Sequence, residues 1–170
     1  MALVVGTDTY ISAVDADAYI NANLISTDAK LVQWFTLAES DKEVLLRKAC
    51  QVIERLPLTG VKTSSAQILQ FPRGVYSEHA ELYEYGHEIV DGVYIQTSVP
   101  QEVKSAQVEI ALQLAVGVSS RVEAQRQGVK SFSLGSLSES YGSYSKYAMT
   151  LSAEAYDLLT PYIRGGFDII

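Results

Sequence analysis

The sequence predicts a mainly α-helical protein: a small bundle of about four helices with a β-hairpin arm and an extended C-terminal tail. Three observations lead to this fold class. Residues 40–56 and 98–115 repeat apolar side chains at helical spacing. Segments that follow Ser12 and Ser152 begin with a serine that can cap a helix. Residues 129–150 are instead rich in Gly, Ser and Tyr, which favours short strands and turns.

The size and charge of the chain restrict its function classes. Its 170 residues, 48% of them hydrophobic, suit one domain with a substantial core. The net charge of −7 disfavours a protein whose main task is to grip phosphate backbones, because such domains carry a basic face. The same negative charge is compatible with a protein that lines a channel through which DNA passes. The N-terminal segment does not resemble a signal peptide and no window approaches the ~18 apolar residues of a membrane span, so we expect a soluble, cytoplasmic protein.

The first helix is predicted over about residues 14–23. Ser12 is its expected N-cap, and Asp15 completes a capping-box pattern. In the connector that follows, the adjacent Trp34 and Phe35 would point about 100° apart on a helix, so at least one should enter the core. The expected core anchors of the first helix are Val14, Ala18 and Tyr19.

The second helix is predicted to begin at Ser40, with Glu43 at the matching capping-box position, and to end at Pro57. Cys50 lies within its apolar pattern and is expected to be a small buried hydrophobe. As the one cysteine of the chain, it excludes an internal disulfide. The predicted apolar face consists of Leu45, Ala49, Val52, Ile53 and Leu56.

The segment LQFPRG, residues 69–74, predicts a buried corner between the two long helices. Pro72 fixes one backbone angle and Gly74 permits a turn, while Arg73 can reach carbonyls at a helix C-terminus or an acid of this or a neighbouring subunit. The loop before it should turn at Gly60 and enter the core at Ile68, Leu69 and Phe71.

Residues 76–97 follow as an acidic insert, which we expect on the surface with a hairpin around Gly86. The next helix has Ser98 as its cap and Pro100 in its first turn. A helix that is apolar on two sides is either central in its domain or shared with a neighbouring subunit. The two predicted stripes are Val103, Ala106, Ile110 and Leu114, and Val108, Leu112 and Ala115.

The last third of the chain is predicted to make contacts. Residues 129–150 form the hairpin arm, with a turn at 134–137 and a tyrosine series that favours protein contact over stacking on nucleic acid. Residues 151–170 supply a short helix capped by Ser152 and an apolar tail that should dock on a partner. The predicted interface residues are Arg73, Tyr141, Tyr144, Tyr147, Tyr156, Tyr162, Phe167, Ile169 and Ile170.

No pattern of catalytic, cofactor or metal-binding residues emerges. Glu81, Glu84 and Glu88 are expected to form a solvated acidic face, and His79 and His87 lack the spacing of a metal motif. The chain has no G-x-S-x-G elbow and no phosphate-binding glycine loop. We therefore expect a protein that is not an enzyme, with no catalytic residues, no cofactor and no metal.

The order of several segments resembles the head–tail connector (adaptor, or head-completion) proteins of tailed phages, some of which are labelled DnaT-like single-stranded-DNA-binding proteins. The resemblance extends from about Tyr10 to Ile163, and the acidic insert is longer than the family's usual link. The segments that carry it are TYISAVDADAYINA, Trp34, DKEVLLRKACQVIE, TGVKTSSAQILQFPRG, VPQEVKSAQVEIAL and GVKSFSLGSLSESY.

The resemblance implies a structural protein of the virion, assembled in the host cytoplasm. It would form a homo-oligomeric ring, usually twelvefold, below the portal protein, extend the DNA channel and dock the tail or a head-completion or tail-terminator protein. Genomic DNA would pass through without specific binding, and no membrane is involved. Residues 1–170 would be one connector domain, with a helical core at 10–128. The alternative is a DnaT-like single-stranded-DNA-binding replication protein, with the tyrosines of the arm as a stacking platform.

Overall fold

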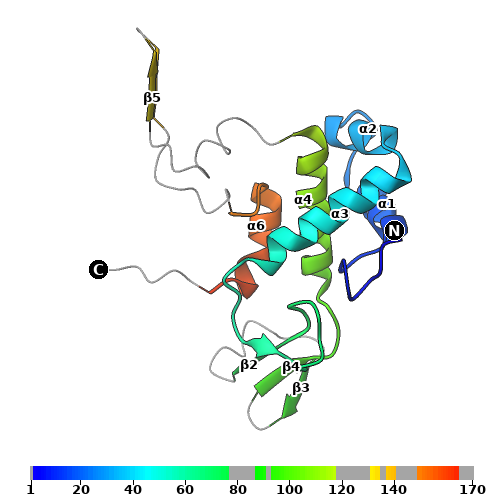
Figure 1. The fold of residues 1–170 in the computed structure, drawn as a ribbon, viewed down its shortest axis with the longest axis vertical. Coiled ribbons are helices and arrows are strands. Elements are labelled where there is room, and N and C mark those ends of the chain that lie inside the picture. Colours follow the sequence, from blue (N-terminus) through cyan, green and yellow to red (C-terminus); the bar gives the residue numbers. More distant parts are fainter. Residues whose placement is uncertain are drawn as a thin grey trace.

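The architecture is mainly helical, with one small antiparallel sheet and a separate β-hairpin (Figure 1). This computed structural model describes residues 2–76, 87–90, 93–117, 131–134, 137–140 and 149–164. Its helices are α1 (Ala13–Asn23), α2 (Ala29–Thr36), α3 (Glu39–Glu54), α4 (Gln101–Val116), α6 (Ala153–Leu159) and the 3₁₀ helix η3 (Thr160–Tyr162). Its strands are β1 (Val61–Lys62), β2 (Arg73–Tyr76), β3 (His87–Val90), β4 (Val93–Gln96), β5 (Ser131–Leu134) and β6 (Leu137–Ser140). The predicted fold class is confirmed.

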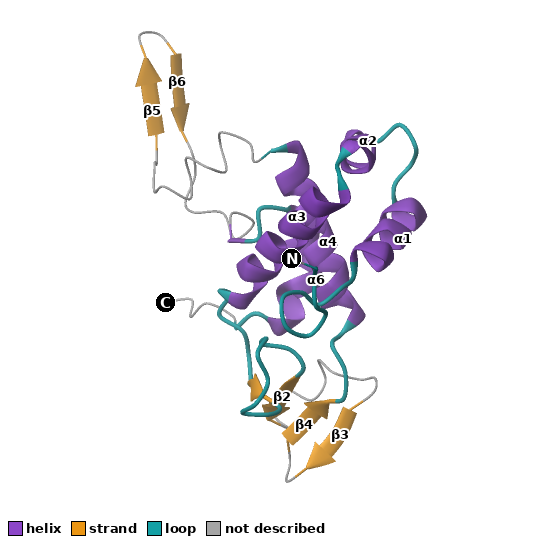
Figure 2. Ribbon diagram, turned by 45° about the vertical axis from the view of Figure 1, so that its right-hand side comes forward, coloured by secondary structure: helices purple, strands orange, loops and turns teal. Residues whose placement is uncertain are grey.

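Helix α4 lies at the centre of the helical core, and α1, α2, α3 and α6 all pack against it (Figures 1 and 2). Its side chains are buried at Val103 and at every position from 105 to 112. Such burial on all sides accounts for its two apolar stripes. Of the two arrangements that the sequence left open, the central helix is therefore the one that the structure contains.

A buried polar side chain, Gln107, ties the N-terminal segment to the core. Its Oε1 accepts a hydrogen bond from the backbone N–H of Tyr10 at 2.9 Å. Its Nε2 donates to Thr9 Oγ1 at 2.6 Å and to the carbonyl of Leu46 at 2.8 Å. A buried amide is tolerated when its donors and acceptor are satisfied, and here the partners come from the N-terminal segment and from α3.

Helix α1 has the predicted N-cap, but the side that it buries differs from the predicted one. The Ser12 hydroxyl accepts from the Asp15 N–H at 3.1 Å, which confirms the N-cap. The predicted anchors were wrong at Val14, which is 76% exposed, and at Ala18, which is also exposed. The residues that α1 buries are Ala13, Ala16 and Ile20. Alanines occur on both sides of this helix, so its sequence contains two apolar series at helical spacing. The contacts with the rest of the protein bury the series that begins at Ala13 and leave the series that begins at Val14 exposed.

Residues 29–36, expected as a connector, form helix α2. Trp34 is fully buried, as predicted, and Asp28 caps the helix. Because α2 ends only two residues before α3 begins, α3 starts at Glu39 with Ala38 as its N-cap. The predicted cap at Ser40 was wrong, since this serine already lies in the first turn.

On α3, Cys50 is buried as predicted, with Ala49, Ile53 and Leu56, while Leu45 and Val52 are only partly buried. The inward face also carries Lys42, whose Nζ lies 3.0 Å from both carboxylate oxygens of Asp17. The indole N–H of Trp34 donates to the same carboxylate at 2.6 Å. One aspartate thus satisfies two buried donors from α2 and α3.

The small sheet has the strand order β1-β2-β4-β3, with every pair antiparallel. Gly60 has a positive φ of 72° and turns the chain into β1. Leu69 and Phe71 are buried as predicted, but Ile68 is 60% exposed, so its predicted place in the core was wrong. The insert forms a hairpin of β3 and β4, joined by two residues, in which Val90 pairs with Val93. Gly86, where we expected the turn, lies outside the described residues.

The predicted hairpin and the C-terminal helix are both present. Strands β5 and β6 pair antiparallel with Leu134 opposite Leu137, which confirms the hairpin. Ser152 caps α6 by accepting from the Ala155 N–H. The end of α6 joins the residues after α3 through hydrogen bonds from Thr59 N–H to the Tyr162 carbonyl and from Arg164 N–H to the Pro57 carbonyl. The proposed division of the chain into core, insert, arm and tail stays a prediction.

Replacing Gln107 by leucine should reduce the free energy of unfolding by about 3 kcal/mol, because the Tyr10 N–H would lose its acceptor in the core. Urea unfolding followed by circular dichroism measures the change. The control is Gln33→Leu on the exposed side of α2, which should change stability by less than about 0.5 kcal/mol. Equal stabilities of the two variants would contradict the role given to Gln107.

Candidate functional site

The corner at residues 69–74 is a structural junction. Phe71 lies between two aromatic rings in edge-on contact: Tyr10, with ring centroids 5.8 Å apart, and Tyr162, at 5.4 Å. The Tyr10 hydroxyl donates to the Glu54 carboxylate, which also accepts from the Gln70 N–H at 3.0 Å. Burial and the Glu54 carboxylate raise the pKa of Tyr10 far above its usual range. The corner therefore connects the N-terminal segment, α3 and the C-terminal helix.

Arg73 is buried in this corner, and its guanidinium binds groups of its own chain. Its Nε donates to the Thr59 carbonyl at 2.6 Å and one terminal nitrogen to the Gly60 carbonyl at 2.5 Å. The other terminal nitrogen donates to Gln70 Oε1 at 2.6 Å. The Thr59 and Gly60 carbonyls lie in the loop that follows α3, and Gln70 lies in the segment between β1 and β2. Of the roles open to Arg73 from the sequence, the structure shows the intramolecular one.

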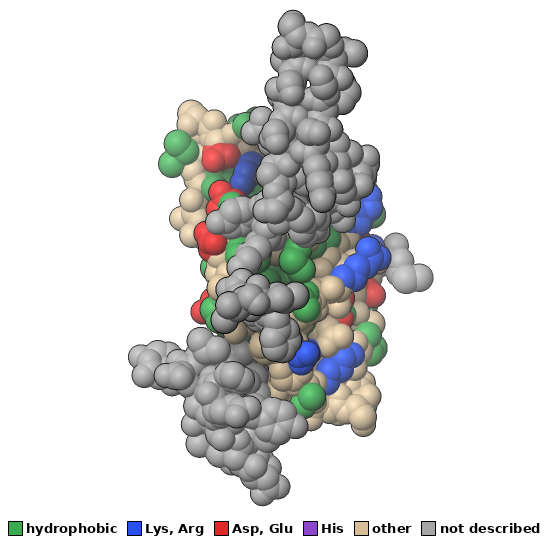
Figure 3. Space-filling model, turned by 90° about the vertical axis from the view of Figure 1, so that its left-hand side faces the viewer, with side chains coloured by type: hydrophobic (Ala, Val, Ile, Leu, Met, Phe, Trp, Pro, Cys, Tyr) green, Lys and Arg blue, Asp and Glu red, His purple; other side chains and the backbone are tan. Residues whose placement is uncertain are grey.

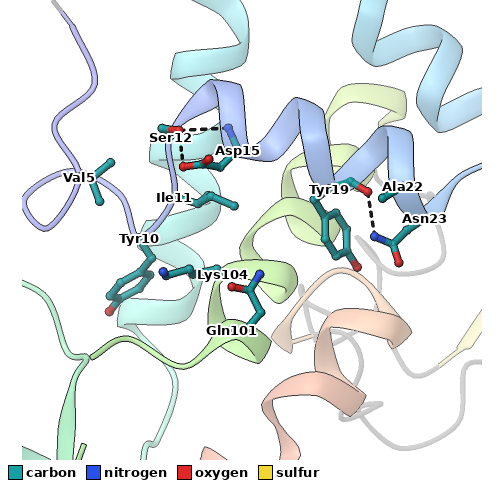
Figure 4. Close-up of a pocket in the computed structure, with 10 residues that line it drawn as sticks. All are labelled: Val5, Tyr10, Ile11, Ser12, Asp15, Tyr19, Ala22, Asn23, Gln101 and Lys104. Atoms are coloured by element: carbon teal, nitrogen blue, oxygen red, sulfur yellow. Dashed lines mark hydrogen bonds between the residues drawn. The ribbon is translucent and has the colours of Figure 1, made fainter. Parts of the chain in front are cut away.

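A groove of about 510 Å³ lies between the N-terminal segment, α1 and the first turn of α4 (Figure 4). Many of its polar groups already have partners within the wall. The Ser12 hydroxyl donates to Asp15 at 2.7 Å, and the Asn23 amide donates to the Tyr19 carbonyl at 2.8 Å. Lys104 and Gln101 project into the same space from α4. The groove brings together no nucleophile and base, and no positions in the sequence pattern pointed to it.

This groove is poorly suited to stacking nucleic-acid bases. The Tyr10 ring is almost completely buried. Tyr19 is half-buried, and its hydroxyl donates to Glu109 Oε1 at 3.1 Å. Stacking platforms for single strands combine open aromatic faces with a basic track, whereas the lining of this groove contains one lysine, Lys104, and one carboxylate, Asp15.

Four helices meet at the buried Glu109 of α4. Besides Tyr19 of α1, its carboxylate has Lys30 of α2 at 3.8 Å, and Lys30 lies 4.0 Å from Glu154 of α6. Burial raises the pKa of Glu109, and Lys30 and the Tyr19 hydroxyl oppose that shift. Burial and the Glu109 charge also raise the pKa of Tyr19 to about 12. Glu154 is more exposed, and hydrogen bonds from its own N–H and the Ser152 hydroxyl lower its pKa.

Five of the nine Lys and Arg side chains in the described part of the chain, Lys30, Lys42, Arg47, Lys62 and Arg73, are bound to acceptors of the same chain. Lys42 pairs with Asp17, and Arg47 lies 3.9 Å from Asp8. Lys62 donates to the carbonyls of Gln67 and Ile68. On the face shown in Figure 3, most of the visible basic side chains lie along one side and most of the acidic ones along the other.

The structure places three of the predicted interface residues. Arg73 and Tyr162 are buried within the chain, and the Tyr162 hydroxyl donates to Glu102 at 3.2 Å. Tyr156 is partly exposed on α6. Their predicted role at an interface is untested. The other six, Tyr141, Tyr144, Tyr147, Phe167, Ile169 and Ile170, lie outside the described residues.

Within the described residues, no three His, Cys, Asp or Glu side chains are grouped closely enough to hold a metal ion. None of the helices in this part of the chain combines the length and hydropathy that a bilayer crossing requires.

Replacing Arg73 by lysine should cost about 2 kcal/mol or more in stability, because one ammonium cannot reach the three acceptor sites that the guanidinium spans. The matched control is Arg55→Lys, at an exposed position of α3, which should leave the melting temperature almost unchanged. Thermal unfolding of both variants measures the difference. A normal melting temperature for Arg73→Lys would refute the structural role.

Replacing Glu109 by glutamine should stabilise the protein increasingly as the pH rises. The folded state holds the Glu109 proton more tightly than the unfolded state, so wild-type stability from this group falls as the pH rises from the unfolded pKa of about 4.3 through the raised folded value. The neutral amide removes that loss. Urea unfolding of both proteins between pH 4 and 8 tests the sign, and a constant difference in stability would contradict it.

A comparison with protein-family models matches residues 2–169 to the family described as "Putative DnaT-like ssDNA binding protein". No curated protein and no solved structure gives a significant match to the chain. The family match covers almost the entire sequence, including all the elements described above. The chain therefore belongs to the DnaT-like family.

Proposed function

We propose that the chain is a structural head–tail connector of a tailed bacteriophage. In this role it forms a ring below the portal protein, extends the DNA channel and offers a docking surface to the tail or its completion protein. It acts in the virion, has no catalytic activity and requires no cofactor. The family description does not itself name this role, and the proposal rests on the sequence resemblance together with the shape and charge of the molecule.

The observation that carries the proposal is the projection of two β elements from opposite ends of the helical core (Figure 2). The sheet of β1, β2, β4 and β3 lies beyond the first turn of α4, and the β5–β6 hairpin stands at the other end (Figures 1 and 2). A rigid core with projecting strands suits a protein whose neighbours lie on several sides, because paired strands can reach partners without disturbing the core. Because the helices pack around α4, the sheet and the β5–β6 hairpin are not part of the helical core.

The charge of the molecule supports the same role. A net charge of −7 on each subunit, repeated around a ring, gives a channel that repels DNA and lets it slide. The internal pairing of Lys42, Arg47 and Arg73 fits a wall without tight DNA binding.

The second candidate is a single-stranded-DNA-binding protein, and the family description favours it directly. Lys48, Arg55 and Arg164 are exposed and would supply phosphate contacts. The tyrosines at 141, 144 and 147, with Lys146, would supply the stacking surface. The charge balance and the occupied basic side chains of the core speak against this function as the main one.

The test measures the mass of the purified protein in solution, first alone and then mixed with the portal protein of the same phage. The connector proposal expects a portal-bound ring of many copies. In parallel, fluorescence anisotropy of a labelled oligonucleotide should show no binding at moderate salt. A protein that ignores the portal and binds the oligonucleotide with a strong salt dependence would overturn the connector proposal in favour of the second candidate.

A further inference from the structure

The outer side of α1 presents an apolar surface that no other described part of the chain covers. Val14 is 76% exposed, and Ile25, just beyond the helix, is 73% exposed. Ala18 and Ala22 are exposed at helical spacing from Val14, so these three residues lie along one side of the helix, and Ile25 follows just beyond its extended C-cap, Leu24. The exposed Asp15 carboxylate lies beside Val14, and α1 contains no lysine or arginine. We refer to Val14, Asp15, Ala18, Ala22 and Ile25 as the α1 surface.

Helix α3 presents a second outward stripe of a different charge. Val44 is 43% exposed, and Lys48, Gln51 and Arg55 are exposed at the following turns. Steps of four, three and four residues place all four side chains on one side of the helix. Within the described residues, neither Lys48 nor Arg55 forms an ion pair. We refer to these four residues as the α3 surface.

We propose that the α1 surface of one copy of this chain binds the α3 surface of the next copy. This inference rests on the proposed ring and identifies its subunit interface. Val14 would pack against Val44, and Asp15 would lie near Lys48, because each charged residue is within one turn of its valine. The contact combines burial of exposed apolar side chains with opposite charges.

The charges favour this head-to-tail arrangement over symmetric pairing. Two α1 surfaces face to face would bring Asp15 against its own copy, and two α3 surfaces would bring Lys48 and Arg55 together. In Figure 1, α3 begins beside α1 and runs to the opposite side of the core, and the two surfaces share no residue. Contacts between two different surfaces continue from copy to copy and close into a ring when the rotation allows it.

A cross-linking experiment tests the pairing directly. The full-length double variant Ala18→Cys/Gln51→Cys carries one thiol on each surface, while Cys50 is buried and should not react. Treatment with a short bismaleimide at high protein concentration should give a ladder of dimers, trimers and larger species. Each single variant should give no cross-linked species, since its one added thiol would face a surface that carries no accessible thiol. Dimers from a single variant, or no ladder from the double variant, would overturn the proposed interface.

Charge substitutions supply the specificity control in the same double-cysteine protein. Val14→Lys places a cation opposite the basic α3 surface and should reduce the ladder at least tenfold. Val61→Lys, at a 55% exposed valine on β1, should leave it unchanged. Lys48→Glu should also reduce the ladder, because it places a second carboxylate near Asp15. Combining Lys48→Glu with Asp15→Lys reverses both charges and should restore much of the cross-linked product. Equal effects of the two valine substitutions would contradict the inference.

Failure of this interface and failure of the proposed function are distinguishable. If the wild-type chain joins the portal as a ring but the double-cysteine variant gives no ladder, the connector role stands and the α1–α3 pairing is wrong. If the chain neither self-associates nor binds the portal, and binds the oligonucleotide instead, the proposed function and the inference that rests on it both fail.

Discussion

The burial of α4 on all sides is the constraint on which the rest of the core depends. At residues 105–112, α4 is surrounded by α1, α2, α3 and α6 and has no solvent-facing side, so each polar residue there needs a partner inside the protein. Gln107 meets this requirement with the N-terminal segment and α3, and Glu109 meets it with Tyr19 and Lys30. The polar residues of α4 thereby fix which elements can surround it.

Local signals in the sequence were sufficient for several elements. Serine caps at Ser12 and Ser152, and the pairing of β5 with β6, depend on residues only a few positions apart, and all three are present as predicted. The two stripes of α4 identified a helix with more than one buried side. The sequence places Arg73 in the corner because Pro72 fixes one backbone angle and Gly74 permits a turn there, and its hydrogen bonds lie in that corner.

The features that escaped prediction depend on distant partners. Lys42 is buried because Asp17 lies beside it, and no local pattern connects the two. The choice between Ala13 and Val14 as the inward residue of α1 depends on the position of α4, since both fit a helical series. Alanine-rich helices leave this choice open because their small side chains make a weak apolar contrast. The groove beside Lys104 likewise gathers residues from three separate segments.

The hydrogen bonds between the end of α6 and the residues after α3 have a consequence for the order of folding. Thr59 donates a hydrogen bond to Tyr162, and Arg164 donates one to Pro57. Segments about a hundred positions apart must therefore meet before the core is closed. During synthesis, the aromatic contact of Phe71 with Tyr162 cannot form until residue 162 has left the ribosome. Between the emergence of α4 and that of α6, the side of α4 that α6 covers therefore stays open, and the helical core closes only when α6 docks.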